Sequence, residues 1–319
     1  MSASFVISLD FELYWGVCDQ LPLSQYRDTL LRTRSAIPAL LDIFAAREIH
    51  ATWATVGALF CESKDELQGL IPPQEHDLAD PLLCFRHYAT DVGESEDDDP
   101  FHFAPSLIRR IADTPHQEIA SHTFGHYYCL EQGASESGLR KDLTAAKTVA
   151  AAKGYELSSL VFPRNQYDNS ALRVAKSLGF TSYRGNPESW FYTPSRFSSE
   201  GILRRGVRLA DAFVDVQGRT DEESSEGGEL PRNVKATALL RPHSPRLKRL
   251  DKLKLRRIKR GMLEAARSGR TYHLWWHPHN FGNHEASNFA ALTNLLDYYK
   301  VLEGEYGMAS RSMSEMVKN

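Results

Sequence analysis

Strand-like and helix-like segments alternate along most of this sequence, and this alternation is what most restricts the possible folds. Strands are predicted at 5–10, 50–56, 118–121, 160–162, 181–184 and 272–276. Helical spacing of apolar residues predicts helices at 24–47, with Pro38 as a kink, and at 136–153, 169–178 and 286–302. This order is typical of an α/β fold with a mainly parallel sheet. We therefore expect a closed or nearly closed β/α barrel.

Two segments interrupt the alternation. The segment 72–103 is rich in proline and acidic residues and has no sustained periodicity, which indicates a long surface loop. The segment 219–229 (RTDEESSEGGE) has the composition of a flexible loop. Neither divides the chain, so we expect a single domain over 1–319 with insertions at 72–103 and 219–270.

The composition limits the class of protein. A chain of 319 residues with 42% hydrophobic and 25% charged residues is long enough to bury a large core. No apolar run reaches the roughly 18 residues of a membrane helix, and the start MSASFVISLD does not look like a signal peptide, so a cytoplasmic protein is expected. The four cysteines form no CxxC pair, which argues against a zinc ribbon or a disulfide scaffold.

Charge is distributed unevenly. The segment 241–270 has twelve Lys/Arg against two acids, or +10, although the chain as a whole carries −3. The rest of the chain therefore carries a net charge of −13, which weighs against nucleic acid as a partner. The basic segment reads either as a helix with a solvated face, or as a surface for anionic lipid or a phosphate-linked sugar.

Polar side chains follow several of the predicted strands. Asp10 and Glu12 end the first strand, and residues two apart on a strand share a face. His122 and His126 follow the strand at 118–121, with the i, i+4 spacing by which two imidazoles on a helical turn can hold one metal ion. Either pair alone also fits an ordinary strand end or buried histidines, but together they favour a site.

Two further strands end in the same way. His277 follows the apolar run Leu274 to Trp276, and His279 lies two residues later. Arg164 and Asn165 follow the strand at 160–162, where an arginine can orient a carboxylate or bind an anionic group. The carboxyl ends of barrel strands are where catalytic groups collect.

Taken in order, these motifs resemble those of the polysaccharide deacetylase family, also called NodB-homology or carbohydrate esterase family 4. The family's fold is a distorted β/α barrel, and the resemblance runs from Phe5 to about Phe281. The segment HTFGH matches the family's His-Ser/Thr-x-x-His motif. Two departures stand out: Phe11 separates the two acids, and FPRNQY stands where the family has Arg-x-Pro-aromatic.

The resemblance implies roles for these residues. Asp10 matches the general base, Glu12 the metal-binding acid, and His277 the histidine that protonates the leaving group, with Arg164 as candidate for the arginine that holds the base. The chemistry is sound: a divalent ion held by two histidines and one carboxylate makes water more acidic and polarises an acyl oxygen. Zinc suits this donor set, although cobalt, nickel or manganese would also fit it.

The expected activity is therefore metal-dependent removal of an N-acyl group, such as acetyl, from an amino sugar in cell-surface polysaccharide or glycolipid metabolism. Side chains near the motifs are candidates for holding the sugar, by stacking or by hydrogen bonds: Trp15, Tyr127, Asn165, Trp276 and His279. Two alternatives stay open. One is hydrolysis of a small cyclic amide or ureide, with or without metal, and the other is a non-catalytic barrel that binds glycan or membrane.

Overall fold

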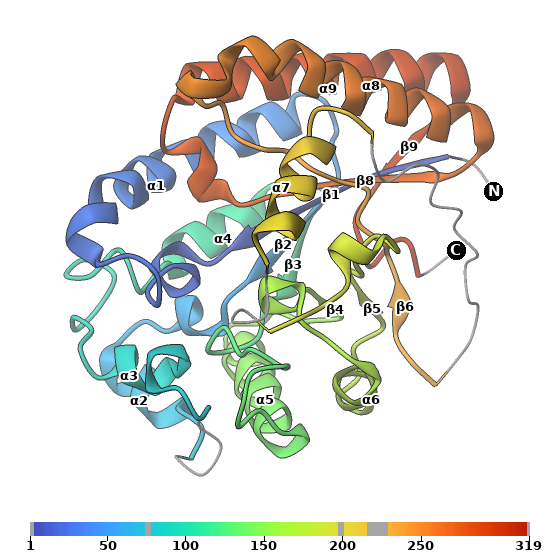
Figure 1. Ribbon diagram of the computed structural model, residues 1–319. Helices are drawn as coiled ribbons and strands as arrows, with labels where there is room; N and C mark the ends of the chain where they lie inside the picture. Colours follow the sequence, from blue (N-terminus) through green and yellow to red (C-terminus); the bar gives the residue numbers. More distant parts are fainter. Residues whose placement is uncertain (1–2, 74–77, 197–200, 216–228, 318–319) are drawn as a thin grey trace.

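Eight parallel strands form the core of the computed structural model, which describes residues 3–73, 78–196, 201–215 and 229–317 (Figure 1). In chain order they are β1 (Ser4–Phe11), β2 (Ala51–Thr55), β3 (Gln117–Ser121), β4 (Ser159–Leu160), β5 (Ser182–Tyr183), β6 (Arg232–Asn233), β7 (Ala238–Leu239) and β8 (Thr271–Trp276). They pair in the order β6-β5-β4-β3-β2-β1-β8-β7. Among the described residues β6 and β7 do not pair, so the sheet curls into a barrel that is open between them.

Helices pack around this sheet. They are α1 (Leu23–Ala45), α2 (Lys64–Leu70), α3 (Phe85–Ala89), α4 (Pro105–Asp113), α5 (Glu136–Ala152), α6 (Asn169–Ser177), α7 (Ile202–Asp211), α8 (Asp251–Ser268) and α9 (Glu285–Tyr306). Side-chain caps begin α5 and α6, where Ser135 and Asp168 accept hydrogen bonds from backbone N–H groups. Gly269 and Gly307 end α8 and α9 in left-handed conformations. In Figure 1, α8 and α9 lie side by side along one flank of the barrel.

Strand β1 lies at the centre of the sheet, with all eight of its residues buried. Its odd-numbered residues from Phe5 to Phe11 belong to the large apolar core. Val6 instead packs in a small separate cluster with Ala54, Val161, Val234 and Met313. Successive side chains of a strand point to opposite faces, so Ser8 and Asp10 lie on the same inner face as Val6. The strand therefore places polar groups inside the barrel, near its carboxyl end.

A short ninth strand, β9 (Ala309–Arg311), pairs with the start of β1. It occupies the edge of Ser4 to Val6, which β2 leaves free because β2 pairs with β1 only from Ile7 onward. Met313 then enters the small inner cluster. The C-terminal segment thus fills the amino end of the barrel, opposite the end where β1 delivers Asp10.

The architecture confirms the expected distorted α/β barrel, and most predicted elements agree to within a few residues. Three local features differ. Helix α1 runs continuously through Pro38. The segment expected as an insertion at 219–270 supplies β6, β7 and α8, so its described part belongs to the barrel. The part of 72–103 that the structure describes forms short helices and loops, including α3.

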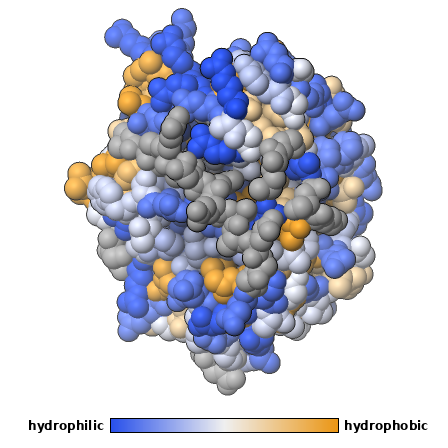
Figure 2. All heavy atoms as spheres, turned by 90° about the vertical axis from the view of Figure 1, so that its right-hand side faces the viewer, coloured by the Kyte–Doolittle hydropathy of each residue, from blue (hydrophilic) through white to orange (hydrophobic). Residues whose placement is uncertain are grey.

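Within the described ranges, none of the helices is long and apolar enough to cross a membrane. Figure 2 shows one side of the molecule, where hydrophilic side chains predominate over the coloured surface and hydrophobic ones form small groups. Helix α8 buries Ile258 and Met262, while its basic residues Lys252 and Arg256, and Arg249 just before it, are exposed. This matches the expectation of a helix that packs an apolar stripe on the barrel.

Candidate active site

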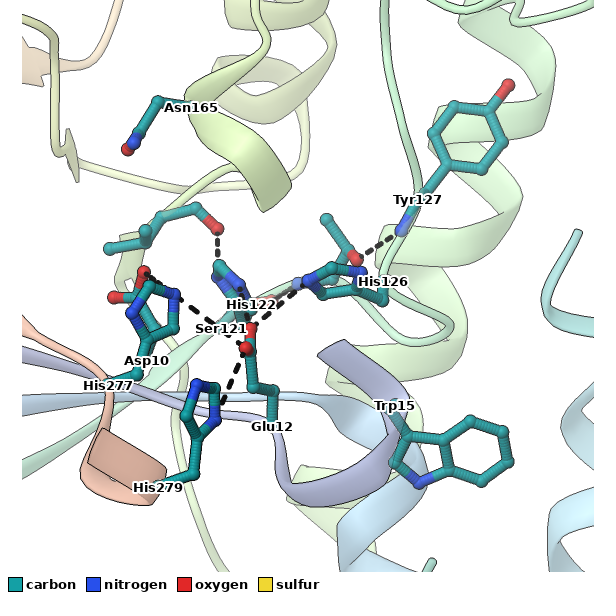
Figure 3. A network of polar contacts seen from close by, with 12 residues as sticks. Asp10, Glu12, Trp15, Ser121, His122, His126, Tyr127, Asn165, His277 and His279 are labelled. Carbon is teal, nitrogen blue, oxygen red and sulfur yellow. Dashed lines mark hydrogen bonds and ion pairs between the residues drawn. The ribbon is translucent and has the colours of Figure 1, made fainter. Parts of the chain in front are cut away.

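Glu12 is the centre of the site at the carboxyl end of β1. Its Oε2 lies 3.2 Å from Nε2 of His122 and 3.2 Å from Nε2 of His126. The ligand atoms of these three residues all lie within 4.8 Å of one another, and all three residues are buried. Figure 3 shows the two imidazoles converging on the carboxylate. The structure therefore brings the acid of the first motif together with both histidines of the second.

The loop after β3 aims the two histidines, and it is irregular rather than helical. Thr123 and His126 have positive φ angles of 64° and 55°. Nδ1 of His122 donates to the carbonyl oxygen of Val161 at 2.8 Å, and Nδ1 of His126 lies 3.0 Å from the hydroxyl of Tyr128. These contacts fix both rings with Nε2 towards Glu12. The i, i+4 spacing thus works here through a strained loop and not through one face of a helix.

The electrostatics favour a negative Glu12 beside a neutral His126. Burial favours the uncharged carboxyl, but the nearby rings of His277, His122 and His126 hold the pKa of Glu12 well below its usual range. Burial lowers the pKa of His126 despite the neighbouring Glu12. A neutral imidazole and an ionised carboxylate are the forms that bind a divalent metal.

This donor set fits a divalent metal. Because Nδ1 of His122 donates to a carbonyl, Nε2 is the nitrogen left to bind a metal, and it faces a carboxylate oxygen 3.2 Å away. A divalent ion between these two atoms would be attracted by the carboxylate and by the lone pair of a neutral ring. Two histidines and one carboxylate are also the protein ligands of open catalytic zinc sites. Glu12, His122 and His126 are thus the residues that would hold the ion.

Asp10 lies beside this cluster, paired with an arginine. Nη1 and Nη2 of Arg184 donate to the two carboxylate oxygens of Asp10 at 2.6 and 2.8 Å. Burial favours the neutral acid, but Arg184 and the nearby His122 lower the pKa of Asp10 from its usual value. Arg184 is itself fixed by Ser8, by Asn165 and by the ring of Trp275. The pair therefore keeps an oriented, ionised carboxylate next to the candidate metal ligands.

Two histidines after β8 complete the cluster. Nε2 of His277 lies 3.7 Å from a carboxylate oxygen of Asp10 and 3.7 Å from one of Glu12. His279 stacks on His277 with ring centroids 4.9 Å apart, and its Nδ1 is 3.7 Å from Glu12. Burial and the adjacent His277 lower the pKa of His279 to about 4. His277 keeps more solvent contact, which suits a group that exchanges protons.

Arg164 occupies a different position from the one that the FPRNQY segment suggested. It pairs with Asp19 and lies over the ring of Tyr128, whereas Arg184 is the arginine that contacts Asp10. The adjacent Asn165 does reach the site, because its side-chain oxygen accepts a hydrogen bond from Arg184 at 3.0 Å. Arg164 has a left-handed backbone with φ of 52°, so the turn after β4 directs it away from Asp10.

The aromatic candidates are placed mostly away from the site, which corrects their proposed contact with sugar. Trp15 is 1% exposed and donates from Nε1 to the carbonyl of His102, and Trp276 is 0% exposed. In Figure 3 the rings of Trp15 and Tyr127 point away from Glu12. Trp275, rather than Trp276, lines the cavity, because neighbouring residues of a strand face opposite sides.

One cavity of about 760 Å³ contains the whole cluster. Its lining includes Asp10, Glu12, His122, His126, His277, His279, Arg164 and Asn165. This volume lies in the roughly 300–1,000 Å³ range of small-molecule sites. The candidate metal ligands are therefore open to a substrate.

Two residues that support the site were missed by sequence reasoning. Arg184 was predicted only as the end of a strand, and its position at a carboxyl strand end was the available signal. Asp142, on α5, is 3% exposed and accepts hydrogen bonds from the backbone N–H groups of Phe124 and Gly125 at 2.6 and 2.9 Å. Those two residues lie between His122 and His126, so Asp142 supports the loop. Nothing in its helical sequence context indicated that role.

Comparison with solved structures supports the fold. A protein from Mycobacterium smegmatis described as a polysaccharide deacetylase is 15% identical, with a TM-score of 0.57 over 100% of this chain and 90% of its own. One from Pseudomonas aeruginosa PAO1 with the same description is 12% identical, with a TM-score of 0.55 over 99% and 89%. Puue allantoinase is 12% identical, with a TM-score of 0.56 over 99% and 88%. Identities this low speak to the fold alone.

Comparison at the level of sequence is more specific. None of the curated proteins matches the chain. The sequence description of the family named polysaccharide deacetylase matches residues 25–183, which include His122 and His126. Asp10, Glu12 and His277 lie outside the matched residues, and the barrel brings them to the same site. The chain thus belongs to the polysaccharide deacetylase family, whose members are hydrolases of carbon–nitrogen bonds other than peptide bonds.

Proposed function

We propose that this protein is a metal-dependent deacetylase that removes an N-acyl group, in the first instance acetyl, from an amino sugar. The proposed setting is cell-surface polysaccharide or glycolipid metabolism. One observation carries the proposal: Oε2 of Glu12 lies 3.2 Å from Nε2 of both His122 and His126, in a cavity that also holds Asp10 and His277. Amide hydrolysis needs a Lewis acid, a base and a proton donor, and this cavity has a candidate for each.

Asp10 is the proposed base. Its pKa is lowered mainly by Arg184 against the effect of burial, so the carboxylate is ionised at neutral pH. The two hydrogen bonds from Arg184 occupy one edge of the carboxylate and fix its orientation. Asp10 can then accept the proton of a water molecule that attacks the acyl carbon.

His277 is the proposed proton donor. It lies 3.7 Å from one oxygen of each carboxylate, and it faces the cavity. An amine anion is too basic to leave unaided, so a positioned acid must protonate the nitrogen as the C–N bond breaks. His279 stacks on His277 and restricts the orientation of its ring.

A divalent ion bound by Glu12, His122 and His126 would supply Lewis acidity towards water and the acyl oxygen. Zinc is the proposed ion, because two imidazoles and one carboxylate suit it, and cobalt, nickel and manganese accept the same donors. With only three protein ligands, such an ion would keep a position for water or substrate, as a catalytic site requires.

The test combines metal analysis with turnover. Protein purified without added metal should contain about one equivalent of a divalent ion per chain, and it should release acetate from N-acetylated amino sugars. His122→Ala should lose both properties. His116→Ala is the matched control, since His116 stacks on His50 outside the cavity. Full metal content in His122→Ala, or no turnover of any amide by the metal-loaded protein, would refute the proposal, the latter in favour of a non-catalytic binding barrel.

Hydrolysis of a cyclic amide or ureide is the second candidate, because the fold is also that of Puue allantoinase. That likeness concerns the fold alone, whereas the donor set of Glu12 and two histidines favours metal-dependent deacetylation. A substrate panel that includes cyclic ureides separates the two. Faster turnover of a ureide, unaffected by a chelator, would favour the second candidate.

We also propose that the basic segment 241–270 attracts an anionic partner, either a membrane surface or a phosphate-linked sugar, in a cytoplasmic protein peripheral to the membrane. The exposed basic residues of α8 support this part of the proposal. Lys254 and Arg257 belong to the interior instead: Lys254 is 3% exposed and pairs with Asp251, and Arg257 pairs with Asp211. The attraction is therefore assigned to the outward-facing residues of α8.

A further inference from the structure

Arginines outnumber acids in the lining of the cavity, away from the candidate metal ligands. Its lining includes three acids, Asp10, Glu12 and Asp211. Against these stand six arginines: Arg164, Arg196, Arg205, Arg208, Arg241 and Arg257. Arg164 pairs with Asp19 and Arg257 pairs with Asp211 within the protein, which leaves Arg241 as the arginine to consider.

The acids of the lining are already engaged within the protein. Asp10 pairs with Arg184, and Glu12 lies among the histidines. Asp211 lies 2.8 Å from Nη2 of Arg257 and accepts a hydrogen bond from the hydroxyl of Tyr192 at 2.9 Å. Asp211 therefore pairs with Arg257, and its charge also acts on Arg241, with which it forms no direct ion pair.

Arg241 is the clearest case. Its guanidinium has no hydrogen bond or ion pair with any residue in the part of the chain that the structure describes, although it lines the cavity and is partly buried. Burial lowers the pKa of both Arg241 and Arg208. The positive charge of Arg241 lowers the pKa of Arg208 further. Both arginines line the same cavity, so an anion bound between them would reduce their mutual repulsion.

The backbone at Arg241 is held firmly. Nζ of Lys254 donates to the carbonyl oxygen of Arg241 at 2.9 Å, and Lys254 is itself buried and 3.0 Å from Asp251. Lys254 thus pairs its charge with Asp251 and uses a further N–H to hold the carbonyl oxygen of Arg241. This hydrogen bond fixes the backbone from which the side chain of Arg241 extends into the cavity lining.

The strand register places Arg241 beside the catalytic cluster. Leu239 of β7 pairs with Trp275 of β8 in parallel, and the N–H of Leu240 donates to the carbonyl of Trp275 at 2.8 Å. Arg241 and His277 each follow the paired residues by two positions, at the carboxyl ends of neighbouring strands. Neighbouring strands lie about 4.8 Å apart, so the positive group and the proposed acid face adjoining parts of one bound molecule.

We propose that the cavity binds an amino sugar that carries a phosphate ester, with Arg241 and Arg208 holding the phosphate while the N-acyl group lies at Glu12, His122 and His126. This rests on the proposed deacetylase function and adds the substrate class. Guanidinium groups bind phosphate oxygens through paired charged hydrogen bonds, and arginine gives up hydration more easily than lysine. The phosphate replaces the carboxylate partner that Arg241 lacks among the described residues.

The phosphate could belong to a nucleotide or to a lipid carrier, and both present the same group. Helix α7, which supplies Arg205 and Arg208 to the cavity, also exposes Ile202 and Leu203, at 88% and 72%. Apolar side chains next to basic ones suit the surface of a lipid aggregate. The assay therefore includes both carriers.

The first measurement is equilibrium binding to the metal-loaded protein by calorimetry. The ligands are one N-acetylated amino sugar, its 1-phosphate, its nucleoside-diphosphate form, its prenyl-phosphate form in detergent, and a uronic acid of the same size. The phosphorylated forms should bind at least tenfold more tightly than the neutral sugar. Arg241→Gln should weaken their binding by about ten- to a hundredfold, the usual effect of losing a charge-assisted pair. Arg241→Lys should restore part of the affinity.

Arg173→Gln is the control, because Arg173 is exposed on α6 and lies outside the cavity lining. Equal affinity for the neutral and phosphorylated sugars, or unchanged phosphate binding in Arg241→Gln, would overturn the inference. Preference for the uronic acid would replace the phosphate with a carboxylate. Turnover is measured separately, so phosphate-selective binding without any acetate release would sink the proposed function and leave the phosphate subsite standing.

Discussion

Arg184 holds Asp10 by two parallel hydrogen bonds, Nη1 to Oδ1 at 2.6 Å and Nη2 to Oδ2 at 2.8 Å, and both side chains are buried. The arginine follows β5 and the acid lies on β1, so the pair spans the interior of the barrel. A planar guanidinium fixes both the charge and the direction of the carboxylate, which a lysine cannot do. The proposed base thus depends on this arginine.

Arg184→Lys should lower kcat by about tenfold or more, because a positioned base contributes roughly 10²–10⁴ to the rate and the variant loses only its orientation. Arg184 lowers the pKa of Asp10 against burial, so weakening the pair should raise that pKa. Asp10 acts in its ionised form, and the acid limb of the kcat/KM profile should therefore move to higher pH. An unchanged profile would mean that Asp10 is not the base that limits the rate.

Gly16 packs directly against Glu12, and this predicts a second variant. A Cβ at Gly16 would lie 2.0 Å from both Cδ and Oε1 of Glu12, a distance that no structure tolerates. Gly16→Ala should push the carboxylate away from His122 and His126 and reduce metal affinity by at least tenfold, in line with loss of a ligand's supporting contact. Isothermal titration of the metal-free protein measures this.

Gly304→Ala is the matched control, because a Cβ at Gly304 meets nothing within 4 Å. Gly304 lies within α9, so alanine there should leave metal affinity unchanged and stabilise the helix by about 1 kcal/mol. Normal metal affinity in Gly16→Ala would show that Glu12 can move without loss, and that it is not an essential ligand.

The sequence predicted the site residues that end strands, but it did not predict the residues that support them. Period-2 alternation placed Asp10 and Glu12 on one face of a strand, and the apolar run before His277 placed it at a strand end. These are local properties of one segment. Arg184 and Asp142 could not be assigned in the same way, because their partners are 174 and 18 residues away in sequence and meet them only through the packing of the barrel.

The aromatic residues show the same limit. Burial decides whether a ring can contact a sugar, and nothing local in the sequence separates Trp275 from Trp276. The pleat of β8 directs Trp276 into the core beside Phe281 and Trp275 towards the cavity. Likewise the strands β6 and β7 have two residues each, too few for any periodicity to reveal them.

Reversing charge on the outer face of α8 and on the turn before it should weaken binding to anionic liposomes. The suitable residues are Lys252 and Arg256 on α8 and Arg249 just before it, all of which are exposed. Their triple change to glutamate should reduce liposome binding at low salt and leave turnover of a neutral N-acetyl sugar unaltered, because the effect is long-range and is screened over about 8 Å at physiological ionic strength. Sedimentation with vesicles measures the bound fraction.

The control for this experiment reverses Lys141, Arg173 and Lys176, which are exposed on α5 and α6. It makes the same change in net charge at another place on the molecule. Equal loss of liposome binding in both triple variants would attribute the attraction to net charge, and no loss in either would return α8 to a purely structural role.

Asp142 gives a prediction about stability. It accepts hydrogen bonds from the N–H groups of Phe124 and Gly125, and burial, partly offset by those bonds, raises its pKa to about 6. An acid whose pKa is higher in the folded state stabilises the fold most below its unfolded pKa of about 3.8, and that contribution is lost as the pH rises to 6. The difference corresponds to about 3 kcal/mol of unfolding free energy.

Asp142→Asn removes the titrating group and replaces one of the two carboxylate oxygens that accept hydrogen bonds from Phe124 and Gly125. The variant should be less stable than the wild type at pH 4, and the gap in unfolding free energy should narrow as the pH rises to 7, because only the wild type loses stability through Asp142 over that range. Urea unfolding at four pH values measures the gap, with the exposed carboxylate Asp113, changed to asparagine, as control. A gap that widened with pH would show that the folded pKa of Asp142 lies below the unfolded one, and that the two N–H groups outweigh burial at this loop.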